Sequence, residues 1–334
     1  MMQTSHLTMP GASGSSSGSL VPIAKPGFWA RAKPALTPTI FLGPAAVLVI
    51  LFFLLPVLLT VGISFTDLAT ATFGGRASFI GLDNYMRMYI SPYTAKIFGN
   101  TITYVVCTLV FFNVGMALVI SLLTTSINKT AGSLFRALWL LPRITPSVIY
   151  VIMWQYMLAD KPSGILSQFL MLFGVEAKNW LYSYPMVACI VANGLIGTSF
   201  GMIIFTSAIE SIPPEYVMAA KVDGASAWQI IRRITVPLIR WPLLFVTAYQ
   251  TLSLLTSFEQ ILLLTNGGPG FYTTEVWALY AYHTALANYF GNTEFGFGSA
   301  LASVLVIIGI IASVVYLRVF RFNQMVAEPK VEVL

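Results

Sequence analysis

The sequence predicts an all-α integral membrane protein with about six transmembrane helices and one charged helix–turn–helix loop. Hydrophobic residues make up 57% of its 334 positions, and charged residues only 9%. The mean hydropathy is +0.80. In soluble domains, roughly a quarter of all residues are charged. Most of the chain is therefore expected in lipid, and the charged loop at 210–240 is the exception.

Six apolar runs are long enough to cross a bilayer, which takes about 20 helical residues. The third run is the least regular, because Pro142, Arg143 and Pro146 interrupt its start and leave a shorter apolar core. Each run predicts one membrane span. The runs cover residues 40–65, 98–123, 135–158, 185–209, 241–265 and 296–320.

The basic residues predict the orientation of these spans. Counted by alternate loops, twelve of the 18 Lys and Arg residues fall on one side, five fall on the other, and Arg143 lies inside a span. Cytoplasmic loops of membrane proteins carry the excess of Lys and Arg. Both termini and the 210–240 loop are thus expected in the cytoplasm. The net charge of +6 reflects this bias and indicates no nucleic-acid partner.

Two tails are expected to flank a single transmembrane domain over residues 37–322. Residues 1–36 include a Gly- and Ser-rich stretch and are predicted to be a disordered cytoplasmic tail. Residues 323–334 form a second short cytoplasmic tail.

Catalytic motifs are absent from the sequence. It has no GxxxxGK[ST] phosphate loop and no HExxH motif, and its two histidines are His6 in the first tail and His283 in a loop. Cys107 and Cys189 both fall within predicted spans, which indicates packing residues rather than a disulfide or a metal site. We expect no catalytic residue, no metal site and no cofactor on this chain.

The charged loop is predicted to form two short helices. Pro213 and Pro214 suit the first turn of a helix, and Gly224 can take the left-handed conformation that ends one. Ser226 can cap the helix that follows, and Pro237 limits it.

This loop resembles the EAA coupling loop of ABC-importer permeases, whose pattern is Glu-Ala-Ala, three residues, Gly, nine residues and Ile-x-Leu-Pro. Met218 stands where the family has its Glu, and Val236 replaces the Leu. The alternative is an amphipathic linker that merely joins two spans. The resemblance implies docking on a separate ATPase subunit through Glu215, Met218, Ala219, Ala220, Asp223, Gly224, Ile234 and Pro237.

Two further stretches are similar to the maltose-type carbohydrate importers. TNGGP at 265–269, followed by TEV at 274–276 and LYAY at 279–282, resembles their T-x-GGP segment and its sequel. FIGLDNY at 79–85 resembles their F-x-G-L-x-N-Y signature. A turn after a helix would be the plain explanation of GGP alone.

The resemblance implies a multi-pass permease subunit in the bacterial cytoplasmic membrane, which translocates a carbohydrate by alternating access. It also implies several partners. These are a periplasmic or lipid-anchored solute-binding protein, a second permease that is expected to be a different chain, and two ATPase subunits that bind ATP and Mg.

Polar residues inside the spans are expected to mark the solute pathway, because burying them against lipid is costly. Asn193, Gly197 and Phe200 share one face of the fourth helix, and the family resemblance places Asn193 and Gly197 on its sugar-contacting face. The expected pathway set is Asn193, Gly197, Phe200, Gln250, Ser253, Ser257, Tyr150 and Trp154. Packing between helices is the alternative explanation of these residues.

Two ionisable residues lie closest to the expected hydrocarbon region. Arg143 is expected to extend back to the cytoplasmic interface, and Glu259 is expected near the outer mouth of the pathway. Either could instead bind a charged group on the solute.

Three alternatives remain beside carbohydrate import. The first is uptake of a charged glycerol derivative, such as glycerol phosphate or a sulfonated sugar glycoside. The second is a secondary transporter or channel, which would require internal repeats or ion-relay carboxylates. The third is a structural membrane anchor, which would leave the coupling loop unexplained.

Overall fold

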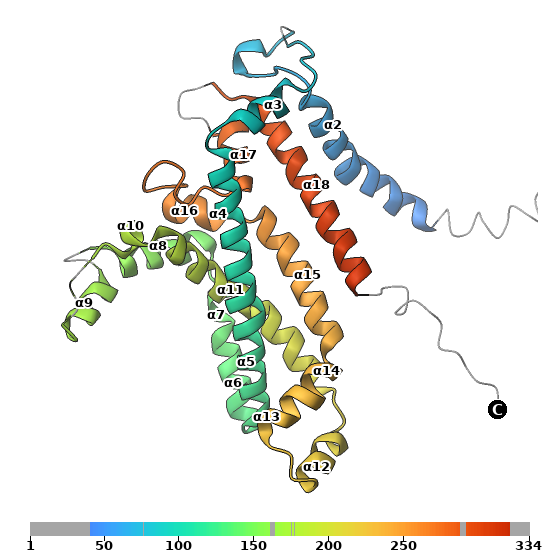
Figure 1. Ribbon diagram of the computed structural model, residues 1–334, viewed down its shortest axis with the longest axis vertical. Helices are drawn as coiled ribbons and strands as arrows, with labels where there is room; N and C mark the ends of the chain where they lie inside the picture. Colours follow the sequence, from blue (N-terminus) through green and yellow to red (C-terminus); the bar gives the residue numbers. More distant parts are fainter. Residues whose placement is uncertain are drawn as a thin grey trace, which may run out of the picture. The chain divides into compact units, whose positions relative to one another are not determined.

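The computed structural model describes residues 41–75, 77–160, 164–174, 176, 178–287 and 292–320. Within these residues the chain is helical, and the only extended pairing is an isolated antiparallel bridge between Thr66 and Phe79 (Figure 1). The all-α prediction is confirmed. The two predicted tails, residues 1–36 and 323–334, lie outside the described residues.

The chain divides into two units, residues 1–56 and 57–334. In the first unit, residues 41–56 are helical and include the π-helix η1 (Ile50–Leu54), whose side chains are all exposed. The boundary falls inside α2 (Leu55–Ile63). All helices discussed below belong to the second unit.

Four helices are long and apolar enough to cross a membrane, and two bent helix pairs raise the number to six within the described residues. The bent pairs are Lys129–Ile144 with Ser147–Leu158, at 97°, and Ala227–Leu238 with Arg240–Thr256, at 69°. The long helices are Phe41–Ile63, Thr94–Ser126, α11 (Pro185–Glu210) and α18 (Phe295–Val319). The prediction of about six spans agrees with the second count.

The third predicted span is broken rather than merely weakened. It consists of α6 (Lys129–Trp139), α7 (Leu141–Ile144) and α8 (Ser147–Leu158). Thr145 is extended, with ψ 133°, because the ring of Pro146 disfavours a helical conformation in the residue before it. The interruption in the sequence therefore becomes a bend of 97°.

The expectation of one continuous run over 241–265 is wrong. α15 (Arg240–Thr256) ends at Ser257, which is extended, and α16 (Glu259–Thr265) begins after Phe258. Ser side chains compete with helical backbone bonds, and the Ser257 hydroxyl donates to Gln260 Oε1 at 3.2 Å. Glu259 then lies in the first turn of α16, where a negative charge is favourable.

The span Thr94–Ser126 packs against α11 through a row of small residues. It comprises α4 (Thr94–Cys107), the π-helix η3 (Thr108–Met116) and α5 (Ala117–Ser126). A Cβ atom added at Gly194, Gly197 or Gly201 of α11 would overlap atoms of this span. Small residues let helix backbones approach closely in membranes. These two spans therefore form the centre of the second unit.

Shorter helices occupy the two ends of the second unit. α12 (Pro214–Val222) and α13 (Ala227–Ile230) lie at one end, while α3 (Asp83–Ile90) and α17 (Trp277–Ala285) lie towards the other (Figure 1). We call these the α12 end and the α17 end. The remaining elements are η2 (Thr70–Thr72), α9 (Ile165–Met171), α10 (Trp180–Ser183), η4 (Ile231–Thr235) and α14 (Val236–Leu238).

Candidate functional site

The turn at the α12 end forms as its residues predict. Pro214 is the first residue of α12, and Gly224 has a positive φ of 78°. The Ser226 hydroxyl accepts from the backbone N–H of Gln229, whose side-chain oxygen accepts from the backbone N–H of Ser226 at 2.7 Å. This reciprocal capping box starts α13 directly after the turn.

Large apolar side chains are exposed on this helix pair. Val222 is 88% exposed, Trp228 68%, Tyr216 57% and Met218 55%. Such clusters on a surface usually mark a contact with another molecule. Of the predicted docking residues, only Ala220 and Ile234 are half-buried, and the others are exposed, namely Glu215, Met218, Ala219, Asp223, Gly224 and Pro237.

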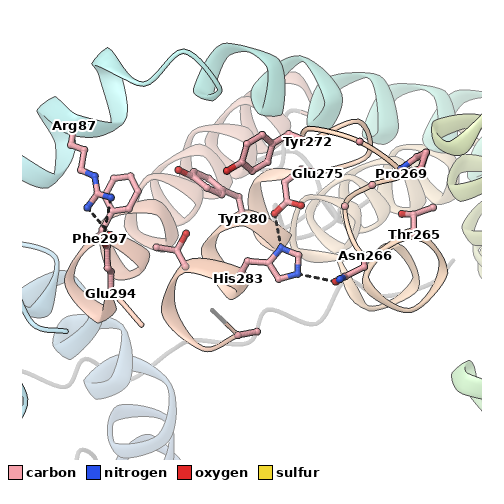
Figure 2. A pocket seen from close by; sticks show the side chains of 15 residues that line it. Arg87, Thr265, Asn266, Pro269, Tyr272, Glu275, Tyr280, His283, Glu294 and Phe297 are labelled. Carbon is pink, nitrogen blue, oxygen red and sulfur yellow. Dashed lines mark hydrogen bonds and ion pairs between the residues drawn. The ribbon is translucent and has the colours of Figure 1, made fainter. Parts of the chain in front are cut away.

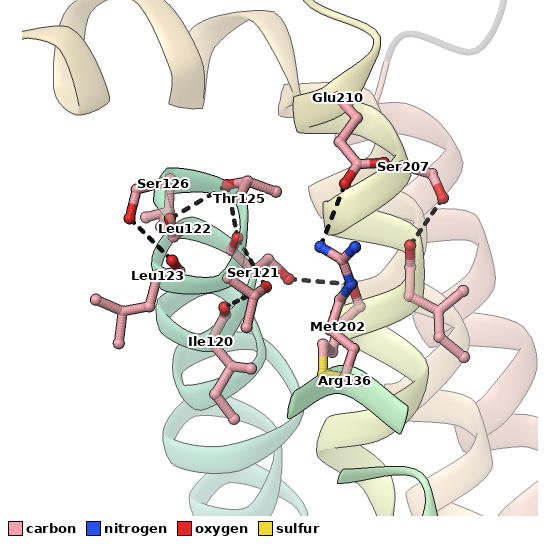
Figure 3. A network of polar contacts seen from close by, with 12 residues as sticks. Ile120, Ser121, Leu122, Leu123, Thr125, Ser126, Arg136, Met202, Ser207 and Glu210 are labelled. Atoms are coloured by element: carbon pink, nitrogen blue, oxygen red, sulfur yellow. Dashed lines mark hydrogen bonds and ion pairs between the residues drawn. The ribbon is translucent and has the colours of Figure 1, made fainter. Parts of the chain in front are cut away.

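An ion pair connects the helices that precede this surface. Figure 3 shows the Arg136 guanidinium of α6 pointing at Glu210, the last residue of α11, and the two groups are 3.2 Å apart. Nearby, the Ser121 hydroxyl donates to the backbone oxygen of Met202 at 3.0 Å. α11 is thereby joined to α5 and α6 directly before the chain enters α12.

A seam of buried polar side chains joins α11 to α4 and to the end of α15. The Asn193 amide nitrogen donates to the Tyr104 hydroxyl and to Ser257 Oγ, the latter at 3.4 Å. Its carbonyl oxygen has no hydrogen-bond partner among the described residues. An amide nitrogen has two donors and its oxygen is an acceptor. The acceptor of Asn193 is therefore the part of the amide that remains free.

Two further predicted pathway residues make bonds between helices. Gln250 Nε2 donates to the backbone oxygen of Gly197 at 3.0 Å, and the Tyr150 hydroxyl donates to the backbone oxygen of Ala192 at 2.8 Å. Gly197 also faces Asn113, whose buried Oδ1 has no partner among the described residues. These contacts serve packing, so the pathway role of Gln250 and Tyr150 stays a prediction.

Phe200 lies in an aromatic row beside this seam. Its ring stacks on Tyr249 of α15 with centroids 4.8 Å apart, and Tyr249 stacks on Phe245 at 6.2 Å. The guanidinium carbon of Arg143 lies 5.7 Å from the centroid of the Phe200 ring. The expectation that Arg143 extends back to an interface is therefore wrong. The bend after α7 directs its side chain to Phe200, near the middle of α11.

Two predicted pathway residues lie outside this group. Ser253 is exposed, and its hydroxyl makes no hydrogen bond to a described residue. Trp154 lies edge-on to Tyr150 at 6.2 Å, but it also lines an apolar cavity of about 380 Å³ with Trp180 and Val187. Glu259 accepts a hydrogen bond from Ser147 Oγ at 2.5 Å.

At the α17 end the TNGGP stretch forms a tight turn that closes on itself. Asn266 and Gly267 both have positive φ, 50° and 80°. Thr265 Oγ1 and Thr274 Oγ1 are 2.7 Å apart, and the Thr274 hydroxyl donates to the backbone oxygen of Gly268 at 2.9 Å. The TEV stretch thus holds the turn in place.

This turn borders an open pocket of about 690 Å³. Figure 2 shows His283 between Glu275 and Asn266, and its ring nitrogens lie 2.9 Å and 3.1 Å from their oxygens. Glu275 is 3% exposed. Across the pocket, Arg87 pairs with Glu294 at 2.6 Å.

Aromatic rings complete the wall of this pocket. Arg87 lies 4.3 Å above the Phe297 ring, and Phe297 is edge-on to Tyr280. Burial, together with the neighbouring Tyr272, raises the pKa of Tyr280 to about 12. The Tyr280 hydroxyl is therefore a neutral hydrogen-bonding group at physiological pH.

The FIGLDNY stretch has a structural explanation in the same region. Asn84 is buried, and its amide donates to the backbone oxygens of Ser64 and Thr66 at 2.8 and 2.9 Å. The Tyr85 hydroxyl lies 2.7 Å from Ser64 Oγ. The motif fixes the chain after the first span against α3.

Four residues of the seam and the aromatic row are absent from the predicted set: Tyr104, Asn113, Phe245 and Tyr249. Asn113 could have been found, because it is an amide inside an apolar run. Tyr104 and Tyr249 carry no such signal, since Tyr is common in apolar surroundings and only the facing helix reveals its partner.

Several long apolar helices, a buried polar seam and an exposed helix pair at one end define a multi-spanning transport subunit of a membrane. The chain belongs to the family of binding-protein-dependent transport system inner membrane components, whose family model matches residues 116–324. It is a multi-pass permease subunit of an ABC importer.

Its relatives include permeases with named solutes. The trehalose/maltose transport system permease of Thermococcus litoralis is 29% identical over 84% of this chain and 92% of its own length. The osmoprotective compounds uptake permease of Synechocystis is 28% identical over 85% of this chain and 99% of its own length. The sulfoquinovosyl glycerol transport system permease of Agrobacterium fabrum is 28% identical over 88% and 93%.

The fold also matches solved structures. A chain in a bacterial ABC transporter involved in the import of the acidic polysaccharide alginate superposes with a TM-score of 0.72, at 22% identity over 90% of this chain and 99% of that chain. A chain in a bacterial alginate ABC transporter in complex with an alginate pentasaccharide-bound periplasmic protein gives a TM-score of 0.75, at 22% identity over 89% of this chain and 98% of that chain. Both confirm the permease fold.

Proposed function

We propose that this permease translocates a carbohydrate or a related glycoside by alternating access, driven by ATPase subunits that dock at the α12 end. One observation carries the proposal. α12 and α13 lie in the chain between α11 and α15, the two helices that bear Asn193, Phe200 and Gln250. A force applied to the exposed helix pair acts directly on the helices that line the polar seam.

The mechanism follows from this connection. Closure of the docked ATPases would move α12 and α13, which are joined by the tight turn at Gly224. α11 and α15 would follow and open the seam towards the α17 end. After hydrolysis the helix pair would return to its first position, and the seam would then open towards the α12 end.

The partners follow from the same arrangement. Two ATPase subunits, which bind ATP and Mg, would bury Met218, Val222 and Trp228. A second permease, expected to be a different chain, would form the other half of the pathway. The solute-binding protein would dock at the α17 end, where the pocket of about 690 Å³ opens. This arrangement puts the α12 end and both termini in the cytoplasm.

The class of solute is supported by the seam and by the relatives. The free oxygen of Asn193 can accept a bond from a hydroxyl, and the ring pair of Phe200 and Tyr249 offers a face to a sugar ring. The relatives transport trehalose or maltose, osmoprotective compounds and sulfoquinovosyl glycerol, as their names state. A charged glycoside is the second candidate, favoured by the position of Arg143 beside Phe200.

The test of function is uptake by the whole assembly in proteoliposomes. Sugars that stabilise the purified binding protein against heat are the solutes to use. We expect uptake that requires the binding protein and ATP. Uptake that runs on an ion gradient without ATP would contradict the proposal and favour a secondary transporter.

The orientation has its own test with two equally exposed positions. Val222 in α12 is 88% exposed and Tyr89 in α3 is 86% exposed. In a variant whose Cys107 and Cys189 are replaced by Ala, expressed without the ATPase subunits that would cover Val222, a membrane-impermeant thiol reagent should label Tyr89→Cys in intact cells and spare Val222→Cys. The opposite labelling pattern would overturn the cytoplasmic assignment of the α12 end.

A further inference from the structure

Arg143 holds an unusual place for a charged residue in a membrane protein. It lies in α7, directly before the 97° bend of the third span. Its guanidinium lies over Phe200, near the middle of α11 and far from either end of that helix. A charge at such a depth costs about 2.5–3.5 kcal/mol on insertion scales, so it is usually retained for a functional reason.

No group of the described chain neutralises this charge. Arg143 forms no ion pair and no side-chain hydrogen bond with a described residue. Glu259, which contacts the same bent span, instead accepts a bond from Ser147 Oγ at 2.5 Å. All five N–H donors of the guanidinium therefore remain available to a ligand.

The surroundings hold the guanidinium in position without cancelling its charge. The Phe200 ring below it stacks on Tyr249, and Tyr249 stacks on Phe245. An aromatic face attracts a guanidinium through its quadrupole, and it leaves the N–H groups at the edge free. Tyr249 is 49% exposed and Phe245 is 53% exposed, so the row continues along an open face of α15.

We propose that Arg143, Phe200 and Tyr249 form a binding site for an anionic substituent on the solute, namely a sulfonate, carboxylate or phosphate attached to a sugar or glycerol unit. The inference rests on the proposed function and specifies its solute. The guanidinium fork binds the oxygens of the anion in pairs, and the stacked rings hold the adjoining apolar face of the solute. Arg143 is thus the residue that distinguishes a charged glycoside from a neutral one.

The experiment uses the purified full transporter in detergent and measures its thermal stabilisation by small probes. Sulfoquinovose and glucose are matched, because a sulfonate replaces the 6-hydroxyl, and glucuronate carries a carboxylate at the same carbon. A ligand that binds the folded state raises the unfolding temperature with its concentration. We expect sulfoquinovose and glucuronate to stabilise the wild-type complex at lower concentrations than glucose does.

The variants separate charge from geometry. Arg143→Gln should weaken the apparent affinity for both anionic probes about ten- to hundredfold, since bonds to a charged group are lost, and leave glucose unchanged. Arg143→Lys keeps the charge but loses the fork, so it should retain part of the affinity. Phe200→Leu should weaken the apparent affinity for both anionic probes several-fold while the complex stays assembled.

Three results would overturn the inference. The first is a wild-type complex stabilised no better by the anions than by glucose. The second is an Arg143→Gln complex that keeps its preference for anions. The third is a double-mutant cycle in which Arg143→Gln and Glu259→Gln each lower the unfolding temperature and their combination lowers it no further, because Arg143 would then act as the partner of Glu259. ATP-driven uptake of a neutral sugar would leave the proposed function standing in each case.

Discussion

The helix pair at the α12 end and the seam around Asn193 distribute polarity in opposite ways. In the helix pair, apolar Met218, Val222 and Trp228 are exposed on the surface. In the seam, the polar groups of Asn193 and Gln250 are buried and bonded to neighbouring helices. The two regions therefore differ in how far their side chains are satisfied within the chain itself. The seam satisfies most of its polar groups within the chain and leaves the side-chain oxygens of Asn193 and Asn113 free, whereas the helix pair exposes its apolar side chains.

The absence of the family's Glu at position 218 changes the kind of contact that the coupling loop can make. An exposed ion pair at position 218 would contribute about 0–1 kcal/mol to docking. Burying the Met side chain that stands there contributes about 1.5–3 kcal/mol. In the proposed docking, replacement of the Glu would therefore favour apolar contact, and Val222, four residues further on, lies on the same face of α12 as Met218.

The largest effect is expected from Gly224→Val. The turn needs a positive φ of 78°, which costs a side-chain-bearing residue about 1–2 kcal/mol and a β-branched one more. We expect the variant to insert in the membrane but to lose the ATPase in co-purification. Gly224→Asn is the control, because Asn tolerates this conformation and nothing lies within 4 Å of an added Cβ. Normal transport by the Val variant would refute the docking role.

Gly201→Val should destabilise the packing of α11 beside the seam. Its side chain would overlap the backbone oxygen of Asn113 and the Cβ of Ala117. Overpacking of this kind costs about 1–3 kcal/mol, so the unfolding temperature of the complex should fall. Gly309→Val in α18 is the matched control, since nothing lies within 4 Å of its Cβ position. Equal effects of the two substitutions would show that the glycine row is unimportant for packing.

Asn193→Ala tests whether the seam also contacts solute. Each hydrogen bond of the amide contributes about 0.5–1.5 kcal/mol, so uptake affinity should fall roughly two- to tenfold if the free oxygen accepts a bond from the solute. Stimulation of ATPase activity by the loaded binding protein is the control readout. A complex that falls apart would assign Asn193 to packing with Tyr104 and Ser257 alone.

Met218→Ala and Met218→Glu compare apolar with charged docking at one position. Truncation to Ala should weaken ATPase association by up to about tenfold, as part of a buried side chain is lost. The Glu variant loses the whole apolar contact and gains at most an exposed ion pair, so it should weaken association at least as much as Ala does. Tighter association of the Glu variant than of the Ala variant would contradict the apolar contact.

The smallest effect is expected at Asp67 in the loop at the α17 end. Hydrogen bonds from the backbone N–H and hydroxyl of Ser78 lower the pKa of the Asp67 carboxyl. This contribution to loop stability is present above the pKa of the unfolded chain and is lost as the pH falls through the lower folded value. Asp67→Asn should therefore alter binding-protein docking slightly at neutral pH and not at all at strongly acidic pH. A pH-independent effect would contradict this assignment.

Much of the fold could be predicted because hydropathy and turn chemistry are local. The apolar runs, the Gly224 turn and the Ser226 cap all follow from short stretches of sequence. The break at Ser257 and the position of Arg143 could not be predicted in this way. The position of Arg143 depends on the ring of Phe200, which another helix supplies. The break at Ser257 depends on whether this hydroxyl bonds to Gln260, and a lone Ser in an apolar run does not indicate that.

The predicted pathway set was incomplete for the same reason. A polar residue inside a span indicates that some partner exists, and it does not say which one. Asn193 was found by its chemistry, whereas its acceptor Tyr104 resembles any aromatic residue of a lipid-facing run until α4 and α11 are placed together.

The glycine row of α11 also determines how this helix can move. Gly194, Gly197 and Gly201 present backbone rather than protruding side chains to the widened turns of η3. Ridges that interlock oppose displacement along a helix axis. The side chains of Phe112 and Asn113 fill the space beside Gly194 and Gly197, so the two helices interlock there. Hydrogen bonds from Thr198 to the Phe112 backbone and from Ser121 to the Met202 backbone join them as well. We therefore expect α11 to move together with η3 and α5 as one body, and the bond from Gln250 to the Gly197 backbone to be the one that changes when α15 moves.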